Sequence, residues 1–386
     1  MNFDFSTAGR IIFGCGSLRQ AGSLAAGLGK RALLVAGRGG ADPALLLKLL
    51  DEAGIQCQVF QISGEPNLVT IQSGVEAGRA FAADFLVGFG GGSALDAAKA
   101  IAALLTNPGE ILDFLEVVGL GRPLAISPLP VLAIPTTAGT GSEVTRNAVI
   151  SVPDKRFKVS LRHPAMLPRI ALVDPELTLT LPPAVTASTG MDALTQVIEP
   201  YLSARANPFT DLYCVEGIRR AARSLVEAVE NGSSLPARTD MAYASLLGGL
   251  SLANAGLGAV HGLAAPIGGM FPAPHGAVCA CLLPLIFQLN LHKAQQEGNH
   301  PDLLERFNRV GQLLLGGPSA AAAEAEARLF ELRQQLRIPP LSAYGVQVSD
   351  LAEIAAQGLK ASSMKANPLL LNQDELIDLL HQALDY

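Results

Sequence analysis

The sequence predicts an α/β domain followed by an all-α domain, and three observations lead to this fold class. In residues 1–180, short apolar runs typical of buried strands alternate with segments whose apolar residues recur at helical spacing. Residues 181–386 have helical spacing almost throughout, and Gly- and Pro-rich breaks divide them into separate helices. Alternating strands and helices indicate a parallel sheet with covering helices, so we place the domain boundary near residue 180.

Apolar runs bounded by Gly, Pro or charge mark the predicted strands. They are RALLVAG from Arg31, QCQVFQI from Gln56, FLVGF from Phe85, VLAIPTT from Val131 and IALVD from Ile170. The segments DPALLLKLLDEAG and NLVTIQSGVEAGRAFAA, which separate the first three strands, are predicted helices. From about Thr186 the predicted helices are interrupted by ARANP, NGSSLP, MFPAPHG, LLGGPS and RIPPLSAYG.

Composition excludes several classes of protein. The net charge of −6 comes without a basic cluster, so we expect no nucleic-acid partner. We find no run of about 20 uninterrupted apolar residues, so we expect no membrane span. The start, MNFDFSTAGR, lacks a basic segment followed by an apolar core, and we therefore expect a cytoplasmic protein.

The cysteines are odd in number and scattered, which argues against a disulfide framework. The chain has five, and two of them, Cys279 and Cys281, alternate within an apolar segment. We interpret these two as packing residues and not as half of a zinc site.

A glycine run, VGFGGGSALDAAKA at residues 87–100, lies where a predicted strand meets a predicted helix, with Ser93 at the expected N-cap. A helix N-terminus presents unpaired N–H groups and the positive end of a dipole, and glycine lets an anion approach the backbone. The run is therefore a candidate phosphate site. Glycine is also the ordinary residue of tight turns, which leaves a purely structural alternative open.

The helical half contains residues that are able to hold a divalent metal. Asp192 and Gln196 are four apart and share one helix face, and His261 and His275 flank a loop rich in Gly and Pro. A carboxylate and two imidazoles on separate helices suit zinc or iron, with positions left for substrate or water. The alternative is that each histidine is an isolated core or cap residue.

Several segments, in this order, closely resemble signature segments of the iron-containing (group III) alcohol dehydrogenases. They are GGGSALDAAKA, AIPTTAGTGSEVT, LVDPELTLTLP, GMDALTQVIEPYLS and HGLAAPIGGMFPAPHG. RIIFGCGSL resembles the family's opening hairpin, and EPNLVTIQSG resembles its second cofactor segment. The resemblance covers essentially the whole chain. It implies a dehydroquinate-synthase-like fold, with a Rossmann-like dinucleotide-binding domain over residues 1–180 and a helical metal- and substrate-binding domain over residues 181–386.

The resemblance also implies roles for individual residues. It places the cofactor pyrophosphate on Gly91, Gly92 and Ser93, and the substrate near Asn147. Further positions that match residues lining the nicotinamide cofactor are Asn67, Thr136, Thr137, Thr140, Thr145 and Lys158. Hydroxyls and an ammonium suit phosphate and ribose oxygens. Taken singly, the threonines also suit turns and Lys158 a solvated surface charge. Asp96 and Lys99 match the family pattern too, but equally suit a charge pair on a helix surface.

Three positions depart from the family pattern. Gly37 and Arg38 stand where relatives that prefer NAD carry an Asp. Without that carboxylate a 2′-phosphate is not repelled, and Arg38 could pair with it, so NADP is favoured over NAD. The alternative is that Arg38 is only a solvated loop residue. Gln196 replaces a histidine ligand with a weaker donor, which leaves Asp192, His261 and His275 to hold zinc or iron, as in the similar three-ligand sites of glycerol dehydrogenases. Ala265 replaces a histidine that relays the alcohol proton, so the proton must pass through water, the cofactor ribose or another side chain.

Together these features predict an NAD(P)-dependent oxidoreductase that moves a hydride between the cofactor and a small alcohol, aldehyde or ketone. Asp192, His261 and His275 are the predicted catalytic residues, because their metal would polarise the substrate oxygen. The alternatives are a metal-free reductase of the same family, a lyase or cyclase of this fold, and a non-catalytic nucleotide-binding relative. Residues 240–290 contain no Lys or Arg, which disfavours the lyase. The resemblance also implies a homodimer or higher homo-oligomer, with the apolar first hairpin as a shared sheet edge.

Overall fold

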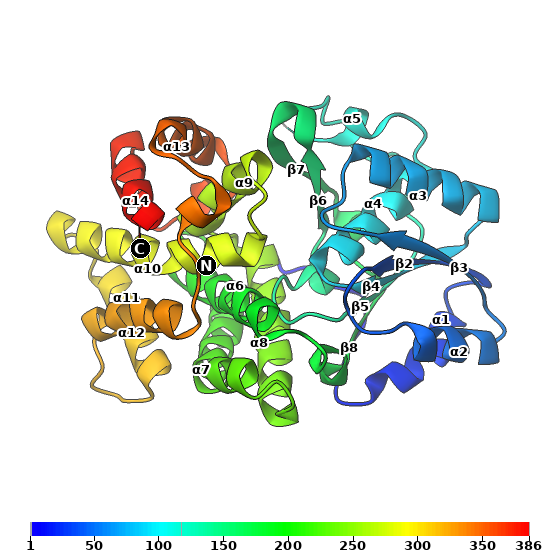
Figure 1. Cartoon of the computed structure of the whole chain (residues 1–386), viewed down its shortest axis with the longest axis horizontal. Coiled ribbons are helices and arrows are strands. Elements are labelled where there is room, and N and C mark those ends of the chain that lie inside the picture. Colours follow the sequence, from blue (N-terminus) through cyan, green and yellow to red (C-terminus); the bar gives the residue numbers. More distant parts are fainter. Residues whose placement is uncertain (1, 117, 386) are drawn as a thin grey trace. The chain divides into compact units, whose positions relative to one another are not determined.

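The computed structural model describes residues 2–116 and 118–385, and the chain forms two compact units (Figure 1). One unit is Ser6–Leu181, and the other is Pro182–Tyr386 with the first residues of the chain, Met1–Phe5. The first unit is built on a parallel sheet covered by helices and the second is helical, which confirms the predicted fold class.

Ser6–Leu181 contains a six-stranded sheet in the order β1-β8-β5-β4-β2-β3, in which every neighbouring pair is parallel. The strands are β1 (Ile11–Phe13), β2 (Arg31–Gly37), β3 (Gln56–Ile62), β4 (Phe85–Gly90), β5 (Val131–Pro135) and β8 (Ile170–Val173). The predicted apolar runs form β2, β3, β4, β5 and β8. Parallel strands need crossover connections, and the helices between the strands supply them.

The expected opening hairpin is wrong. Strand β1 pairs in parallel with β8, with Ile11 opposite Ala171, and forms one edge of the sheet. The chain after β1 then turns into a short 3-10 helix, Ser17–Gln20. The carboxylate of Asp174, at the end of β8, accepts hydrogen bonds from the backbone N–H groups of Gly16 at 3.1 Å and Leu18 at 2.9 Å. These bonds hold the turn at the end of β8, so the chain does not return as a second hairpin strand.

The two faces of the sheet are covered by different helices. Leu33 and Val35 of β2 pack with α3 (Leu68–Phe81) and α4 (Gly92–Thr106), whereas Leu34, between them, packs with α1 (Ala21–Ala25) and α2 (Ala44–Glu52). Successive side chains of a strand point to opposite faces. Figure 1 shows α3 and α4 on one side of the sheet and α1 and α2 on the other. The short helix α5 (Ile111–Phe114) joins the α4 side.

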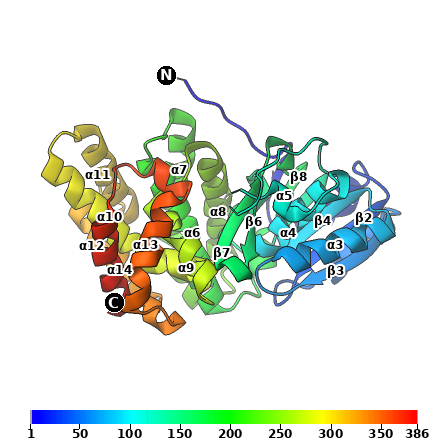
Figure 2. The same ribbon diagram turned by 90° about the horizontal axis from the view of Figure 1, so that it is seen from above.

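An antiparallel hairpin, not predicted from the sequence, follows β5. It consists of β6 (Asn147–Val152) and β7 (Phe157–Arg162). Ala148 and Ile150 are buried and belong to the same core as α4, so the hairpin extends the covering layer of that face (Figure 2). Its alternating pattern, NAVISV, is only six residues long and does not stand out from the surrounding loops in the sequence.

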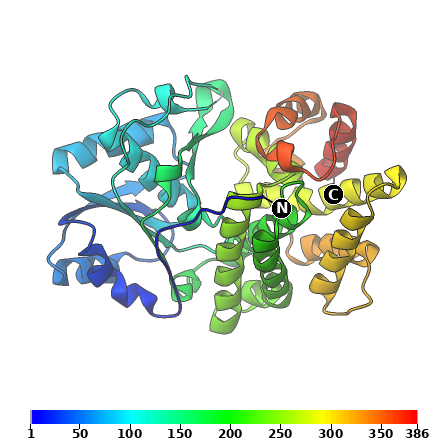
Figure 3. The same cartoon turned by 180° about the vertical axis from the view of Figure 1, so that it is seen from behind.

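The second unit is a set of helices (Figure 3). They are α6 (Pro183–Leu202), α7 (Pro208–Glu230), α8 (Leu235–Ala255), α9 (Ala259–Met270), α10 (His275–Glu297), α11 (Pro301–Leu315), α12 (Ala322–Gln335), α13 (Leu351–Lys360) and α14 (Gln373–Asp385). Glycines let α6, α7 and α8 pack closely, since a Cβ on Gly190 would lie 2.3 Å from Leu225 and one on Gly217 would lie 2.6 Å from Val197. Phe3 stacks on Phe209 of α7, with ring centroids 5.3 Å apart, which ties the start of the chain to this unit.

Among the described residues, α10 is the only individual helix that is long and apolar enough to cross a membrane. Helices α8 and α9 pass the same test only if they are taken together, and they are bent by 100°. In α10, 78% of the apolar window is buried inside the protein. Packing in the core therefore accounts for the apolar character of this helix.

A buried lysine links α4 to the segment after β5. Lys99 is 1% exposed, and its ammonium donates to the carbonyl of Ser142 at 3.0 Å and to the hydroxyl of Thr145 at 3.1 Å. It also pairs with Asp96 at 3.1 Å, and Asp96 accepts a hydrogen bond from the Ser142 hydroxyl at 2.5 Å. The alternative of a surface charge pair at Asp96 and Lys99 is therefore wrong. Their charges fasten the loop that follows β5 onto α4.

Glu143 lies in the same network and carries the most perturbed carboxyl group of this region. Burial raises the pKa of Glu143 to about 7, against the opposing effect of its backbone and of the Lys99 charge. A carboxyl whose pKa is higher in the folded than in the unfolded chain binds its proton more tightly when folded. Below about pH 4.5 ionisation of Glu143 therefore does not lower the free energy of unfolding. The loss of stability grows between about pH 4.5 and pH 7 and is complete above that.

Glu143→Gln is expected to stabilise the protein at pH 8 and to change its stability little at pH 5, because glutamine has the same shape and no charge to bury. The expected gain in the free energy of unfolding at pH 8 is on the order of 1 to 3 kcal/mol. Denaturant unfolding at both pH values measures it. Glu76→Gln, an exposed position of α3, is the matched control. An equal effect of Glu143→Gln at the two pH values would contradict the assignment.

Candidate functional site

The carboxyl ends of three neighbouring strands bring most of the predicted cofactor residues together. From β2 the chain proceeds outward to β3, whereas from β4 it proceeds the opposite way to β5. The ends of β2 and β4 therefore form a topological switch point, where open parallel sheets bind ligands. Gly37 and Arg38 end β2, Gly91 follows β4, and Thr136 follows β5.

The glycine run forms a helix N-terminus whose first N–H groups receive no side-chain cap among the described residues. Helix α4 begins at Gly92, and its N-cap is Gly91, in an extended conformation with φ −73° and ψ −173°. The expected N-cap at Ser93 is therefore wrong, and Ser93 lies within the first helical turn. Gly90, at φ 149°, turns the chain between strand and helix. The uncapped N–H groups and the helix dipole suit a phosphate.

Threonines after β5 pack against this glycine loop. A Cβ on Gly91 would lie 3.2 Å from the methyl carbon of Thr137, and one on Gly92 would lie 2.7 Å from that of Thr140. Thr136 is fully buried, and its hydroxyl has no hydrogen-bond partner among the described residues. A buried hydroxyl without a partner is costly, so its place beside the switch point favours a ligand-binding role.

Two other predicted cofactor residues use their polar atoms within the protein. The side-chain oxygen of Asn67 caps α3, accepting from the backbone N–H of Thr70 at 2.9 Å and from its hydroxyl at 3.0 Å. The Thr145 hydroxyl accepts from the Lys99 ammonium and is buried. Both side chains therefore have structural roles that are independent of any ligand.

The remaining predicted cofactor and substrate residues of Ser6–Leu181 differ in exposure. Lys158 is 8% exposed and pairs with Glu65 at 2.5 Å, so the alternative of a solvated surface charge is wrong. Arg38 is exposed beyond the end of β2, next to the half-buried Gly37. Asn147 is the first residue of β6 and is half-buried.

In the helical unit, one cluster brings together Asp192 of α6, His261 of α9, and His275 and Cys279 of α10. One donor atom of each residue lies within 4.8 Å of those of the others. Asp192 Oδ1 is 3.3 Å from Nε2 of His261 and 3.8 Å from Nε2 of His275. Cys279 Sγ is 3.6 Å from Nε2 of His275 and 3.8 Å from Nε2 of His261. His275 is half-buried, and the other three are buried.

Two glycines allow the helices that carry these residues to approach α6. A Cβ on Gly276, next to His275, would lie 2.5 Å from the carbonyl oxygen of Ser188. A Cβ on Gly258, just before α9, would lie 2.8 Å from a carboxylate oxygen of Glu199. Without side chains at these positions, the first turns of α10 and α9 lie directly against α6.

Glu199 fixes the orientation of His261. One carboxylate oxygen of Glu199 lies 2.6 Å from Nδ1 of His261, and the other accepts the backbone N–H of Val260 at 2.7 Å. The ring in its neutral form donates its Nδ1 proton to Glu199, so the lone pair of Nε2 points into the cluster. This carboxylate–histidine pair is typical of metal-ligating histidines.

The donor set fits a divalent cation. Asp192 is 1% exposed, and its Oδ1 has no hydrogen-bond partner among the described residues. Burial raises the pKa of Asp192, but the imidazoles of His261 and His275 outweigh it, and the net effect holds the pKa below its usual value. Burial lowers the pKa of His261, but its neighbours Cys279, Glu199 and Asp192 outweigh it and raise the pKa, so without a metal ion Nε2 holds a proton near Asp192 Oδ1, 3.3 Å away. A divalent cation bound here would take the place of that proton.

The structure places one further donor group in the cluster. Cys279, interpreted above as a packing residue, is fully buried, and its sulfur also lies near both imidazoles. The missed signal was its spacing of four from His275, which places both on one face of α10. Cys281 is buried with its sulfur 3.7 Å from the carbonyl oxygen of Ala383, in agreement with a packing role. Gln196 is buried one turn after Asp192, with its Cβ against Gly248 of α8.

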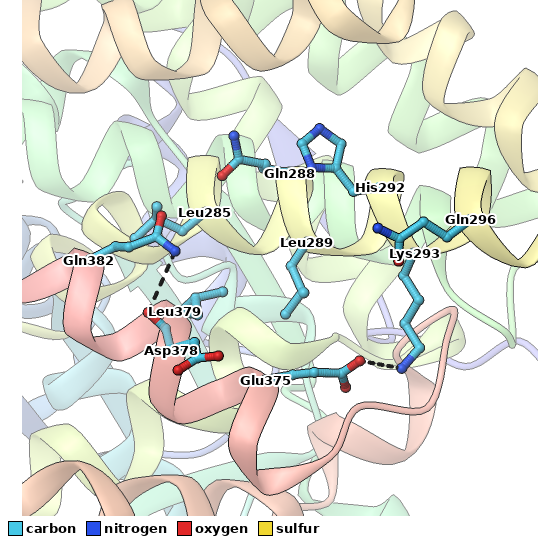
Figure 4. Close-up of a pocket in the computed structure, with 10 residues that line it drawn as sticks. All are labelled: Leu285, Gln288, Leu289, His292, Lys293, Gln296, Glu375, Asp378, Leu379 and Gln382. Carbon is cyan, nitrogen blue, oxygen red and sulfur yellow. Dashed lines mark hydrogen bonds and ion pairs between the residues drawn. The ribbon is translucent and has the colours of Figure 1, made fainter.

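A pocket of about 270 Å³ lies between α10 and α14 (Figure 4). Its rim includes the ion pair between Lys293 and Glu375 at 2.6 Å. The pocket begins at Leu285, ten residues after His275, and none of the predicted site residues lines it. It is therefore separate from the candidate metal site.

Comparisons with known proteins agree with this arrangement. The family model described as iron-containing alcohol dehydrogenase matches residues 8–175, and that of the Fe-containing alcohol dehydrogenase family, C-terminal, matches residues 186–384. The chain is 36% identical to 1,3-propanediol dehydrogenase of Klebsiella pneumoniae over 390 residues, which cover 99% of this chain and 98% of the relative. It is 35% identical to alcohol dehydrogenase 4 of Saccharomyces cerevisiae (strain YJM789), with 92% of each chain covered.

Solved structures are similar over the full length. A crystal structure of 1,3-propanediol oxidoreductase has a TM-score of 0.90 at 35% identity and covers 99% of this chain and 100% of its own. The crystal structure of sulfoacetaldehyde reductase from Bifidobacterium kashiwanohense, in complex with NAD+, has a TM-score of 0.87 at 26% identity. The match covers 100% of this chain and 99% of that chain. The fold and the matches define an oxidoreductase that acts on alcohols. The chain belongs to the iron-containing alcohol dehydrogenase family.

Gly92→Ala is expected to destabilise the protein even without cofactor, by about 1 to 3 kcal/mol, because the new methyl group meets Thr140. Denaturant unfolding of the cofactor-free protein measures this loss. The double variant Gly92→Ala/Thr140→Ala removes the clash and should recover most of it, with Thr140→Ala alone as the control. A Gly92→Ala variant more stable than the wild type would show that the loop is free of this contact.

Proposed function

We propose that this protein is an NAD(P)(H)-dependent alcohol dehydrogenase that interconverts a small alcohol and its aldehyde or ketone with the help of one divalent ion. Asp192, His261 and His275 would hold the ion. The observation that carries the proposal is the buried Oδ1 of Asp192, which has no hydrogen-bond partner among the described residues and lies 3.3 Å from Nε2 of His261. When bound, the ion supplies Lewis-acid chemistry, polarising the carbonyl oxygen and stabilising the alkoxide.

The residues of the cluster have distinct tasks in this proposal. Asp192 supplies a negative charge, which its lowered pKa keeps ionised at neutral pH. Glu199 is a positioning residue, since it holds the Nδ1 proton of His261 and keeps Nε2 available. His275, with its side chain 35% exposed, marks the open side of the cluster, from which a substrate can approach. Ala265, one turn after His261, has no proton to exchange, so the alcohol proton leaves through water, the cofactor ribose or another side chain.

The cofactor would bind at the switch point of the parallel sheet. We propose that the pyrophosphate lies on the N-terminus of α4 at Gly91, Gly92 and Ser93. The hydroxyls of Thr137 and Thr140 lie beside this loop, and with that of Thr136 they would complete the cradle. The structural relative solved with NAD+ supports a nicotinamide cofactor at this kind of fold.

The outer part of the cofactor site rests on the family resemblance. It would comprise Asn67, Thr145 and Lys158, with Asn147 next to the substrate. The side chains of Asn67, Thr145 and Lys158 already bind protein groups. Their proposed contribution is therefore to shape the cofactor site while they hold its walls together.

We also propose NADP(H) as the preferred cofactor, a homodimer or higher homo-oligomer, and a cytoplasmic location. The cofactor preference is supported by the absence of a carboxylate at Gly37 and Arg38, where β2 ends. The oligomer is supported by strand β1, which forms an edge of the sheet with half-buried side chains.

The metal-assisted reaction is tested by removing one ligand. His261→Ala is expected to lower kcat/KM for aldehyde reduction at least about a hundredfold and to lower the content of bound metal, because the ion loses a strong donor. Metal analysis and steady-state kinetics measure both. His292→Ala, on the same helix as His275 but in the separate pocket, is the control. Full activity of a metal-free His261→Ala protein would identify a metal-free reductase instead.

The cofactor preference is tested at the end of β2. Gly37→Asp is expected to raise the ratio of the NADPH to the NADH dissociation constant at least about tenfold, since a carboxylate close to the 2′-phosphate repels it. Fluorescence titration with both cofactors measures the ratio. Ser233→Asp adds the same charge at an exposed loop of the helical unit and should leave the ratio unchanged. An unchanged ratio in Gly37→Asp would remove the basis for the NADP(H) preference.

A further inference from the structure

We propose that Cys279 is a fourth metal ligand and binds as a thiolate, so that the cluster is an Asp-His-His-Cys site that favours zinc over iron. This inference rests on the proposed metal site and concerns its composition. It is carried by the position of the Cys279 sulfur, which is 3.6 Å and 3.8 Å from the Nε2 atoms of His275 and His261.

The distances between the donor atoms match a tetrahedral zinc site. With zinc about 2.0 to 2.1 Å from nitrogen and about 2.3 Å from sulfur, a tetrahedron separates these two donors by about 3.6 Å. It separates nitrogen from a carboxylate oxygen by about 3.4 Å. The observed separations are 3.6 and 3.8 Å for the sulfur–nitrogen pairs and 3.3 and 3.8 Å for the oxygen–nitrogen pairs. These four separations are compatible with one zinc ion bound by all four atoms.

A hydrogen bond from the thiol does not account for the cluster. Cys279 is fully buried and has a single S–H, so it can donate to only one of its three neighbours in the cluster, the two imidazoles and Asp192. The other two then receive no bond from the thiol. One cation at the centre satisfies the oxygen, the sulfur and both nitrogens together.

Cys279 would bind as the thiolate, since the thiolate and not the thiol is the metal ligand. On metal binding the S–H bond breaks, a sulfur–metal bond forms and the proton passes to solvent, with no change in oxidation state.

The local sequence explains why this cysteine, and not its neighbour, faces the cluster. Cys279 follows His275 by four residues, so both point from the same face of α10. Cys281, two residues further along, points to Ala383 instead. A soft thiolate ligand favours zinc among the metals that N and O donors accept, and zinc can add a fifth ligand, which leaves room for a substrate oxygen.

Cobalt(II) tests this proposal because a thiolate bound to it produces an intense charge-transfer band in the near ultraviolet, whatever the activity. The apoprotein, prepared by chelation, is titrated with Co2+ alone. Wild type and Cys281→Ser are expected to show the band, and Cys279→Ser is expected to lose it while keeping the visible bands of bound cobalt. The zinc dissociation constant, from competition with a chromophoric chelator, should rise at least about tenfold in Cys279→Ser and stay unchanged in Cys281→Ser.

A second variant keeps the test independent of how well Cys279→Ser folds. Replacing Cys15, Cys57, Cys214 and Cys281 by serine leaves Cys279 as the only thiol, and the band should persist. Cobalt that binds wild type without the band, or a band that survives in Cys279→Ser, would overturn ligation by Cys279 while leaving the metal site in place. Failure of wild type to bind cobalt or zinc at all would instead overturn the metal site on which the proposal rests.

Discussion

The hydrogen bond between Glu199 and His261 is the interaction on which the candidate metal site depends. At 2.6 Å the Nδ1–H group of His261 donates to Glu199, which fixes the ring so that Nε2 is the nitrogen that faces Asp192. The carboxylate of Glu199 also binds the backbone of Val260, so the same group sets both the tautomer and the position of the helix that carries the ring.

The architecture of the first unit was largely predictable because parallel strands buried on both faces are continuous apolar runs. Strand β1 escaped this logic, since its three residues are too short to distinguish a parallel edge strand from a hairpin, and the contacts of Asp174 that decide between them come from far along the chain. The hairpin β6–β7 was missed for a related reason. Its burial depends on α4, which no local pattern reveals.

The candidate metal residues were predictable by type but not as a set. Asp192, His261 and His275 were chosen because carboxylate and imidazole groups bind metals, and only the packing of α6, α9 and α10 shows that they meet. The alternation of Cys279 with Cys281 in an apolar segment indicates packing. The spacing of four between His275 and Cys279 is the pattern that places both side chains on one helix face. Likewise, Asn67 and Thr145 were assigned from resemblance, and the hydrogen bonds that give each of them a structural role are visible only in three dimensions.

Gly276 has a consequence for how the site is assembled. Because α10 carries both His275 and Cys279, the close contact of its first turn with the Ser188 carbonyl positions two donor groups at once. The donors are thus brought together during folding, and little conformational entropy remains to be lost when an ion binds. A single added methyl group at Gly276 would push the helix end from α6 and shift half of the donor set together. The affinity of the centre is in this sense a property of a helix contact that contains no ligand atom.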